Sequence, residues 1–117
     1  MPGPELKTDT VTAGDAVVCV LSGDLHLGTA GVADHALREA LERHPALLGV
    51  DLSAVELFTA EGLNLLLALR DRAASQGVSL VLIAPSRGAR HVLDTTGATL
   101  TFALYATVEE AIAQHEQ

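Results

Sequence analysis

The sequence has a single cysteine, Cys19, and no tryptophan. One cysteine excludes a disulfide within the chain, and its apolar surroundings predict that the thiol behaves as a small hydrophobic group. Aromatic residues make up only 3% of the chain, whereas hydrophobic residues make up 49%. A core must therefore consist mainly of leucine, valine and alanine, and 117 residues suffice for one such core. The composition predicts one folded domain rather than a disordered chain.

Positive charge is also scarce. Seven lysine and arginine residues stand against 15 aspartate and glutamate residues, which gives a formal net charge of −8. Such a chain is repelled by nucleic-acid phosphates and by anionic lipid headgroups, so we expect neither nucleic acid nor a membrane as a partner. The one basic cluster, Arg87 to Arg90 with His91, is interpreted as the solvated start of a helix.

Long hydrophobic runs are missing as well. No window approaches the roughly 18 apolar residues of a transmembrane helix. The N-terminus, Met1 to Glu5, lacks the basic and apolar segments of a signal peptide. We therefore expect a cytoplasmic location.

Apolar runs of strand length alternate with stretches of helical periodicity. Residues 6–12 alternate in the manner of an edge strand, and a turn at Gly14 predicts a hairpin with the apolar run that follows. Thr29 is positioned to cap the first helix and Gly77 to end the second in the left-handed conformation. The expected strands span residues 6–12, 16–21, 46–52, 78–84 and 101–105, and the expected helices span 29–44, 59–76 and 86–97, with a last one from 107.

This order predicts an α/β domain over residues 1–117, in which a mixed, mostly parallel sheet of about five strands is flanked by about four helices. Residues 1–5 and 114–117 are expected to be loose.

Catalytic motifs are missing from the sequence. It contains no glycine-rich phosphate loop and no nucleophile elbow, and its five histidines lack the spacing of metal ligands. Asp24 and His26 could form half of an acid–base pair, but no nucleophile lies near them in the sequence. We predict no catalytic residue, no metal site and no cofactor, and hence a binding protein rather than an enzyme.

The segment from Val50 to Leu67 is the most informative part of the chain. A buried strand is expected to lead through a short loop into the N-terminus of an apolar helix, where free amides and the helix dipole favour negative charge. Such an end suits a phosphate group or the carboxylate of Glu61. The alternative is that Thr59 and Glu61 simply cap and stabilise the helix.

The chain resembles the STAS family, and in particular the anti-sigma factor antagonists of bacterial partner-switching systems. The resemblance covers nearly the whole chain, and its specificity comes from the order and spacing of several short segments. These segments are residues 18–25, 50–55 with Gly62 and Leu63, 80–86, 92–97 and 105–111.

The resemblance implies the STAS, or SpoIIAA-like, fold and a protein partner: an anti-sigma factor that is also a serine kinase. It also implies a phosphoacceptor serine at the start of the second helix, in a stretch that reads Asp-Ser-Ser-Gly-Leu in the family. Here the stretch runs from Thr59 to Leu63, and Glu61 occupies the phosphoacceptor position. A carboxylate cannot be phosphorylated by a serine kinase. His26 and Thr59 stand where the family has aspartates.

These departures have two interpretations. Glu61 imitates the phosphorylated state with one negative charge, or the site has drifted and the STAS scaffold serves another interaction. Thr59 is a candidate substitute acceptor. The alternative function is a small-ligand sensor or a scaffold subunit of a larger signalling complex, and a homodimer is left open. The expected partner-binding residues are His26, Phe58, Thr59, Ala60, Glu61, Gly62 and Asn64.

Overall fold

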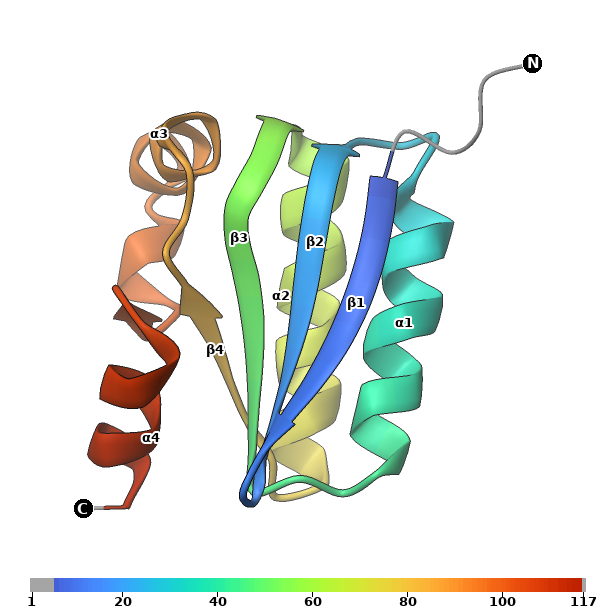
Figure 1. Ribbon diagram of the computed structural model, residues 1–117. Helices are drawn as coiled ribbons and strands as arrows, with labels where there is room; N and C mark the ends of the chain where they lie inside the picture. The colour runs from blue at the N-terminus through green and yellow to red at the C-terminus, as the bar shows by residue number, and fades with distance from the viewer. Residues whose placement is uncertain (1–5, 117) are drawn as a thin grey trace.

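The computed structural model describes residues 6–116, whose five strands form one mixed sheet in the order β1-β2-β3-β4-β5 (Figure 1). The sheet and four α-helices agree with the predicted fold class. The strands are β1 Leu6–Ala13, β2 Ala16–Leu25, β3 Leu47–Phe58, β4 Ser79–Ile83 and β5 Leu104–Tyr105. The helices are α1 Ala30–Glu42, α2 Ala60–Ser75, α3 Arg87–Thr96 and α4 Val108–His115, with a 3₁₀ turn η1 at Ala98–Leu100.

The first two strands form the predicted antiparallel hairpin. Gly14 closes its turn with a φ of 61°, a left-handed conformation that glycine adopts without a steric penalty. Among the strands that the structure describes, β1 pairs only with β2, so it lies at the edge of the sheet, as its alternating pattern predicts. From β2 to β5 all neighbouring strands run parallel, because a helix connects each strand to the next.

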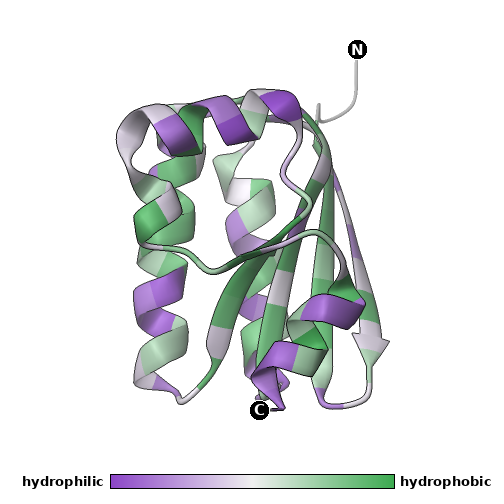
Figure 2. Ribbon diagram, turned by 90° about the vertical axis from the view of Figure 1, so that its left-hand side faces the viewer, coloured by the Kyte–Doolittle hydropathy of each residue, from purple (hydrophilic) through white to green (hydrophobic). Residues whose placement is uncertain are grey.

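The helices cover the two faces of the sheet unequally. In Figure 1, α1 and α2 lie behind the sheet, whereas α4 lies in front of it near β4. The larger hydrophobic core lies on the α1–α2 side and includes Leu37 and Leu66, and a smaller core joins Val18 and Ile83 to Ala111 of α4. Hydrophobic residues predominate in the sheet and on the sides of the helices that face it, while hydrophilic residues lie mainly on the outer sides of the helices (Figure 2).

Three strands differ from the prediction. β3 continues to Phe58, where a loop was expected after Leu52, because β2 also extends to Leu25 and the two strands stay paired across two register shifts. The polar residue Ser53 interrupts the apolar run, which hid the continuation. β5 has only two residues, Leu104–Tyr105, because Thr101 still has the helical conformation of the C-cap of the 3₁₀ turn and the chain becomes a strand only at Leu104.

The ends of the helices follow their sequence signals in most places. Gly77 and Gly97 have φ values of 75° and 77° and follow the ends of α2 and α3. Thr29 occupies the N-cap position of α1, but its side chain makes no capping hydrogen bond, contrary to the prediction. The hydroxyl is engaged in the preceding loop instead. The expectation that residues 1–5 are loose lies outside the described residues, and Gln114 and His115 belong to α4.

α3 is fastened to the edge of β3 through backbone atoms. The Ser86 hydroxyl accepts a hydrogen bond from Ala89 N–H at 3.2 Å and donates one to the carbonyl oxygen of Val55. Gly88 lies so close to β3 that a Cβ atom would come within 2.8 Å of the Glu56 carbonyl oxygen. The close contact therefore requires glycine at position 88.

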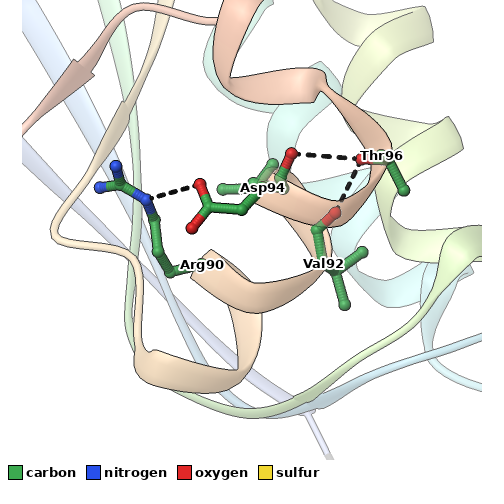
Figure 3. Close-up of polar contacts among 5 residues, drawn as sticks. Arg90, Val92, Asp94 and Thr96 are labelled. Atoms are coloured by element: carbon green, nitrogen blue, oxygen red, sulfur yellow. Dashed lines mark hydrogen bonds and ion pairs between the residues drawn. The ribbon is translucent and has the colours of Figure 1, made fainter.

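The basic part of α3 is solvated, in agreement with its interpretation as a helix start. Arg87, Arg90 and His91 are exposed. Arg90 Nε donates to Asp94 Oδ1 at 3.0 Å, and the Thr96 hydroxyl donates to the Val92 carbonyl oxygen at 2.7 Å (Figure 3). The exposed ion pair contributes at most about 0.5 kcal/mol to the stability of the fold, so it is not what holds α3 in place.

Cys19 of β2 is fully buried, and burial raises the pKa of its thiol to about 11. A hydrogen bond with Thr10 lowers the pKa, and the charge of Asp9 raises it further, but burial dominates. The folded protein thus holds the thiol in its neutral form, and an unfolded chain ionises it near pH 9.0.

We predict that Cys19 makes the protein less stable in alkali. Stability from this group is fully present below pH 9.0 and is lost as the pH rises toward about 11, because only the unfolded state then releases the proton readily. The measurement is urea unfolding between these pH values for the wild type and Cys19→Ala. Cys19→Ala should be less stable at neutral pH but should lose less stability in alkali. Parallel curves for the two proteins would contradict the prediction.

Candidate functional site

The predicted site lies where β2 and β3 end side by side and α2 begins. Leu25, the last residue of β2, is the register partner of Phe58, the last residue of β3. Only Thr59 separates β3 from α2. Since both strands are parallel, their carboxyl ends and the α2 N-terminus share one edge of the sheet (Figure 1).

Thr59 ties the start of α2 to the end of β2. Its backbone N–H donates to the Leu25 carbonyl oxygen at 3.1 Å, and its hydroxyl donates to the same oxygen at 3.3 Å. Thr59 is the N-cap residue of α2, with extended φ and ψ of −110° and 175°, but its side chain makes no capping bond. The alternative in which the Thr59 hydroxyl caps the helix is therefore wrong. The hydroxyl binds the neighbouring strand instead.

Gly62 allows α2 to approach β2 closely. A Cβ atom at this position would lie 2.8 Å from Leu25 Cγ and 3.2 Å from the Leu25 carbonyl oxygen. The first distance is shorter than real Cβ contacts, so any larger residue must push the helix or the strand away. Gly62 is buried and fixes the geometry of the site without forming its surface.

The exposed part of the site consists of Ala60, Glu61 and Asn64, on the first turns of α2. Glu61 is the acidic residue of the first turn, where the positive end of the helix dipole favours a carboxylate. Within residues 6–116, the Glu61 side chain takes part in no ion pair or hydrogen bond. Its charge is therefore presented to solvent at the tip of the helix.

The loop between β2 and α1 brings His26 to the same edge of the sheet. Thr29, which is 4% exposed, organises this loop: its hydroxyl donates to the Asp24 carbonyl oxygen at 2.7 Å and accepts from the His26 N–H at 3.1 Å. His26 Nδ1 accepts from the Gly28 N–H at 2.9 Å. These bonds satisfy backbone groups that the strand leaves free, so the loop has a defined conformation.

The structure divides the predicted partner-binding residues into two groups. His26 and Thr59 are half-buried, and Ala60, Glu61 and Asn64 are exposed. Phe58, by contrast, is 4% exposed and packs in the larger core. Phe58 and Gly62 therefore support the surface from below, since neither presents a side chain on it.

Two exposed leucines near this surface are not among the residues predicted from the sequence. Leu27, beside His26, is 75% exposed, and Leu57, beside Phe58, is 48% exposed. Leu57 is the register partner of Asp24, next to the paired ends of β2 and β3. The signal for Leu27 is an isolated leucine between His26 and Gly28 in a loop, and the signal for Leu57 is its alternation with the buried Phe58.

The main hollows of the described residues lie away from this edge of the sheet. A hollow of about 670 Å³ is lined by residues that include Arg70, Tyr105 and His115, near the start of β4. Residues 6–116 contain no group of His, Cys, Asp and Glu side chains that could hold a metal ion. None of their helices has the length and apolar character needed to cross a membrane.

Comparison with known proteins shows the family to which the chain belongs. The sequence pattern of the STAS domain matches residues 7–111. The anti-sigma-F factor antagonist RsfB of Mycobacterium tuberculosis is 31% identical over 113 residues, which cover 96% of this chain and 92% of RsfB. The chain therefore belongs to the STAS domain family. It is homologous to an anti-sigma factor antagonist over nearly its whole length.

Solved structures agree with this assignment. The crystal structure of an anti-sigma factor antagonist from Mycobacterium paratuberculosis superposes with a TM-score of 0.88, at 25% identity and over 100% of both chains. The Bacillus cell fate determinant SpoIIAA in its phosphorylated form gives a TM-score of 0.69 at 19% identity, over 92% of this chain and 98% of SpoIIAA. The second likeness concerns the fold alone and confirms the STAS, or SpoIIAA-like, fold.

We predict opposite effects for alanine at two glycines. Gly62→Ala should lower the free energy of unfolding by about 1–3 kcal/mol, because its Cβ meets Leu25. Gly31→Ala, in the first turn of α1, has nothing within 4 Å of its Cβ and should raise stability by up to about 1 kcal/mol. Urea unfolding of both variants is the measurement. An equal gain in both would show that α2 does not depend on close contact with β2.

Proposed function

We propose that this protein is an anti-sigma factor antagonist, which regulates transcription by binding an anti-sigma factor through the surface at the start of α2. The observation that carries the proposal is its 31% identity to the antagonist RsfB across 96% of the chain. Binding requires no catalytic step, and we propose that the protein is not an enzyme. We also propose that it acts in the cytoplasm, where transcription takes place in bacteria.

The charge at position 61 determines how such binding would be controlled. The family resemblance implies a phosphoacceptor serine at this position, and Glu61 has no hydroxyl group to accept a phosphate. It presents a single negative charge at the helix tip, compared with nearly two for a phosphoserine. We propose that the usual phosphorylation switch is absent at this residue and that the protein binds its partner without that control.

Leu27 and Leu57 suit a protein partner better than a small charged ligand. Exposed aliphatic side chains gain free energy when a partner removes them from water, and a few such residues often dominate the affinity of an interface. The hydrogen bonds of Thr29 hold the loop that carries Leu27, so little conformational entropy is lost on binding. We propose that both leucines contact the anti-sigma factor beside His26 and Glu61.

We predict that Glu61→Ser restores a phosphorylation site. When the purified protein is incubated with ATP and a serine-kinase anti-sigma factor from the same genome, Glu61→Ser should gain one phosphate and the wild type should gain none. Intact-mass spectrometry followed by peptide mapping identifies the site. Glu61→Ala is the matched control, because it removes the carboxylate without adding a hydroxyl group.

The other results of this experiment are equally informative. A phosphate on wild-type Thr59, absent from Thr59→Val, would show that threonine replaces the usual acceptor. No binding of either form to any such kinase would overturn the proposed partner and leave only the family fold.

We predict that Leu27→Ser and Leu57→Ser each weaken anti-sigma factor binding about tenfold, because each removes exposed apolar area from the centre of the proposed interface. Leu100→Ser is the matched control, since Leu100 is 93% exposed and lies in the 3₁₀ turn after α3. Isothermal titration calorimetry measures the affinities, and thermal unfolding checks that all three variants remain folded. Equal losses in all three variants would place the interface elsewhere.

The alternative of a ligand sensor depends on the hollow beside β4. Its lining residues Arg70, Tyr105 and His115 offer donors to an anionic ligand, but they lie away from the family's switch position. A nucleotide panel in a thermal-shift assay distinguishes the two functions. A rise in melting temperature that Arg70→Ala abolishes would favour the sensor.

A further inference from the structure

Within residues 6–116, no strand pairs with the outer edge of β1. β1 pairs with β2 along one side only, and in Figure 1 it is the last strand of the sheet on its side. The backbone groups along the free side of an edge strand are available to another strand. β1 has eight residues, Leu6–Ala13, which is long enough to pair with one.

The hydrogen bonds show which residues of β1 face outward. The Asp15 carbonyl oxygen accepts from Ala46 N–H, so odd-numbered residues at the start of β2 face β3 and even-numbered residues face β1. Because Val18 is paired with Val11, the odd-numbered residues of β1 bond to β2 and the even-numbered ones point outward. Thr10 agrees with this, since its N–H donates to the carboxylate of Asp9 at 3.0 Å instead of to β2.

The charges on β1 select one way for two copies to pair. Lys7 and Asp9 are both exposed and lie on the same face of the strand. When two β1 strands run antiparallel with Thr8 opposite Thr8, each Lys7 lies opposite the Asp9 of the other copy. Shifting the centre of pairing to residue 7 or 9 would set Lys7 against Lys7 or Asp9 against Asp9, which is unfavourable.

The same register matches the outward-facing backbone groups. It pairs Thr8 with Thr8 and Leu6 with Thr10 of the other copy, and these residues all direct their N–H and carbonyl groups to the free edge. The arrangement has the two-fold symmetry of most homodimers, because each strand offers the same surface to the other. α1 contacts β1 and β2 and lies behind the sheet in Figure 1.

We propose that this protein forms a homodimer through antiparallel pairing of its β1 strands, centred on Thr8, with two Lys7–Asp9 ion pairs between the copies. In the monomer, Asp9 accepts the outward N–H of Thr10 and so protects the edge. In the dimer, this N–H donates to the Leu6 carbonyl oxygen of the other copy, and Asp9 is released to face Lys7. The small interface and this competition make the dimer weak and sensitive to salt.

Charge exchange tests the register. Sedimentation equilibrium of the full chain, over a concentration series at low salt, should show a monomer–dimer equilibrium for the wild type. Asp9→Lys and Lys7→Asp should each weaken dimerisation about tenfold, because each places like charges opposite one another. The double variant Lys7→Asp/Asp9→Lys should regain dimerisation, since it reverses both charges of each pair. Asp71→Lys, an exposed position on α2, controls for the change in net charge.

A second variant tests the backbone pairing without changing charge. Thr8→Pro removes an outward N–H that β2 does not use, so the monomer should keep its fold by circular dichroism and lose the dimer. A wild type that is monomeric up to millimolar concentration overturns the proposal and leaves Lys7 and Asp9 as charges that protect the edge. A dimer that resists the single charge variants, or a double variant that fails to regain dimerisation, also overturns it.

Discussion

The geometry of the proposed binding surface depends on the carbonyl oxygen of Leu25. It ends β2, accepts the N–H and the hydroxyl of Thr59, and lies against the backbone of Gly62. The two donors come from the residue that links β3 to α2, so one oxygen fixes two strands and a helix relative to one another. The exposed residues at the start of α2 owe their positions to this buried contact.

Much of the fold follows from simple patterns in the sequence. Apolar runs of strand length alternate with stretches of helical periodicity, and Gly14, Gly77 and Gly97 all mark chain reversals or helix ends with positive φ. The second half of β3 was not predictable in this way, because Ser53 ends the apolar run although the strand continues. Its continuation depends on pairing with the end of β2, and single-sequence periodicity carries no information on such pairing.

The family resemblance predicts where the site lies, but the sequence did not predict which of its residues are exposed and which are buried. Position 61 is exposed at the helix tip, as a modification site must be. Phe58 and Gly62 belong to the same segment but are buried, because β3 arrives as a strand and directs Phe58 into the core. Thr59 is a residue type that often caps helices, but here its hydroxyl binds a carbonyl group of the adjacent strand. Only the three-dimensional arrangement distinguishes these roles.

The anchoring of α3 to β3 has a consequence for how this scaffold can diversify. Ser86 donates hydrogen bonds to the main-chain oxygens of Leu52 and Val55, and Gly88 lies against the carbonyl oxygen of Glu56. The exposed side chains in the outer half of β3, at Ser53, Ala54, Glu56 and Leu57, can therefore be exchanged without loosening the helix. The main chain of the strand holds the helix, while the exposed side chains of the strand remain free to vary. Related chains can therefore acquire new partners through surface substitutions and keep the same fold.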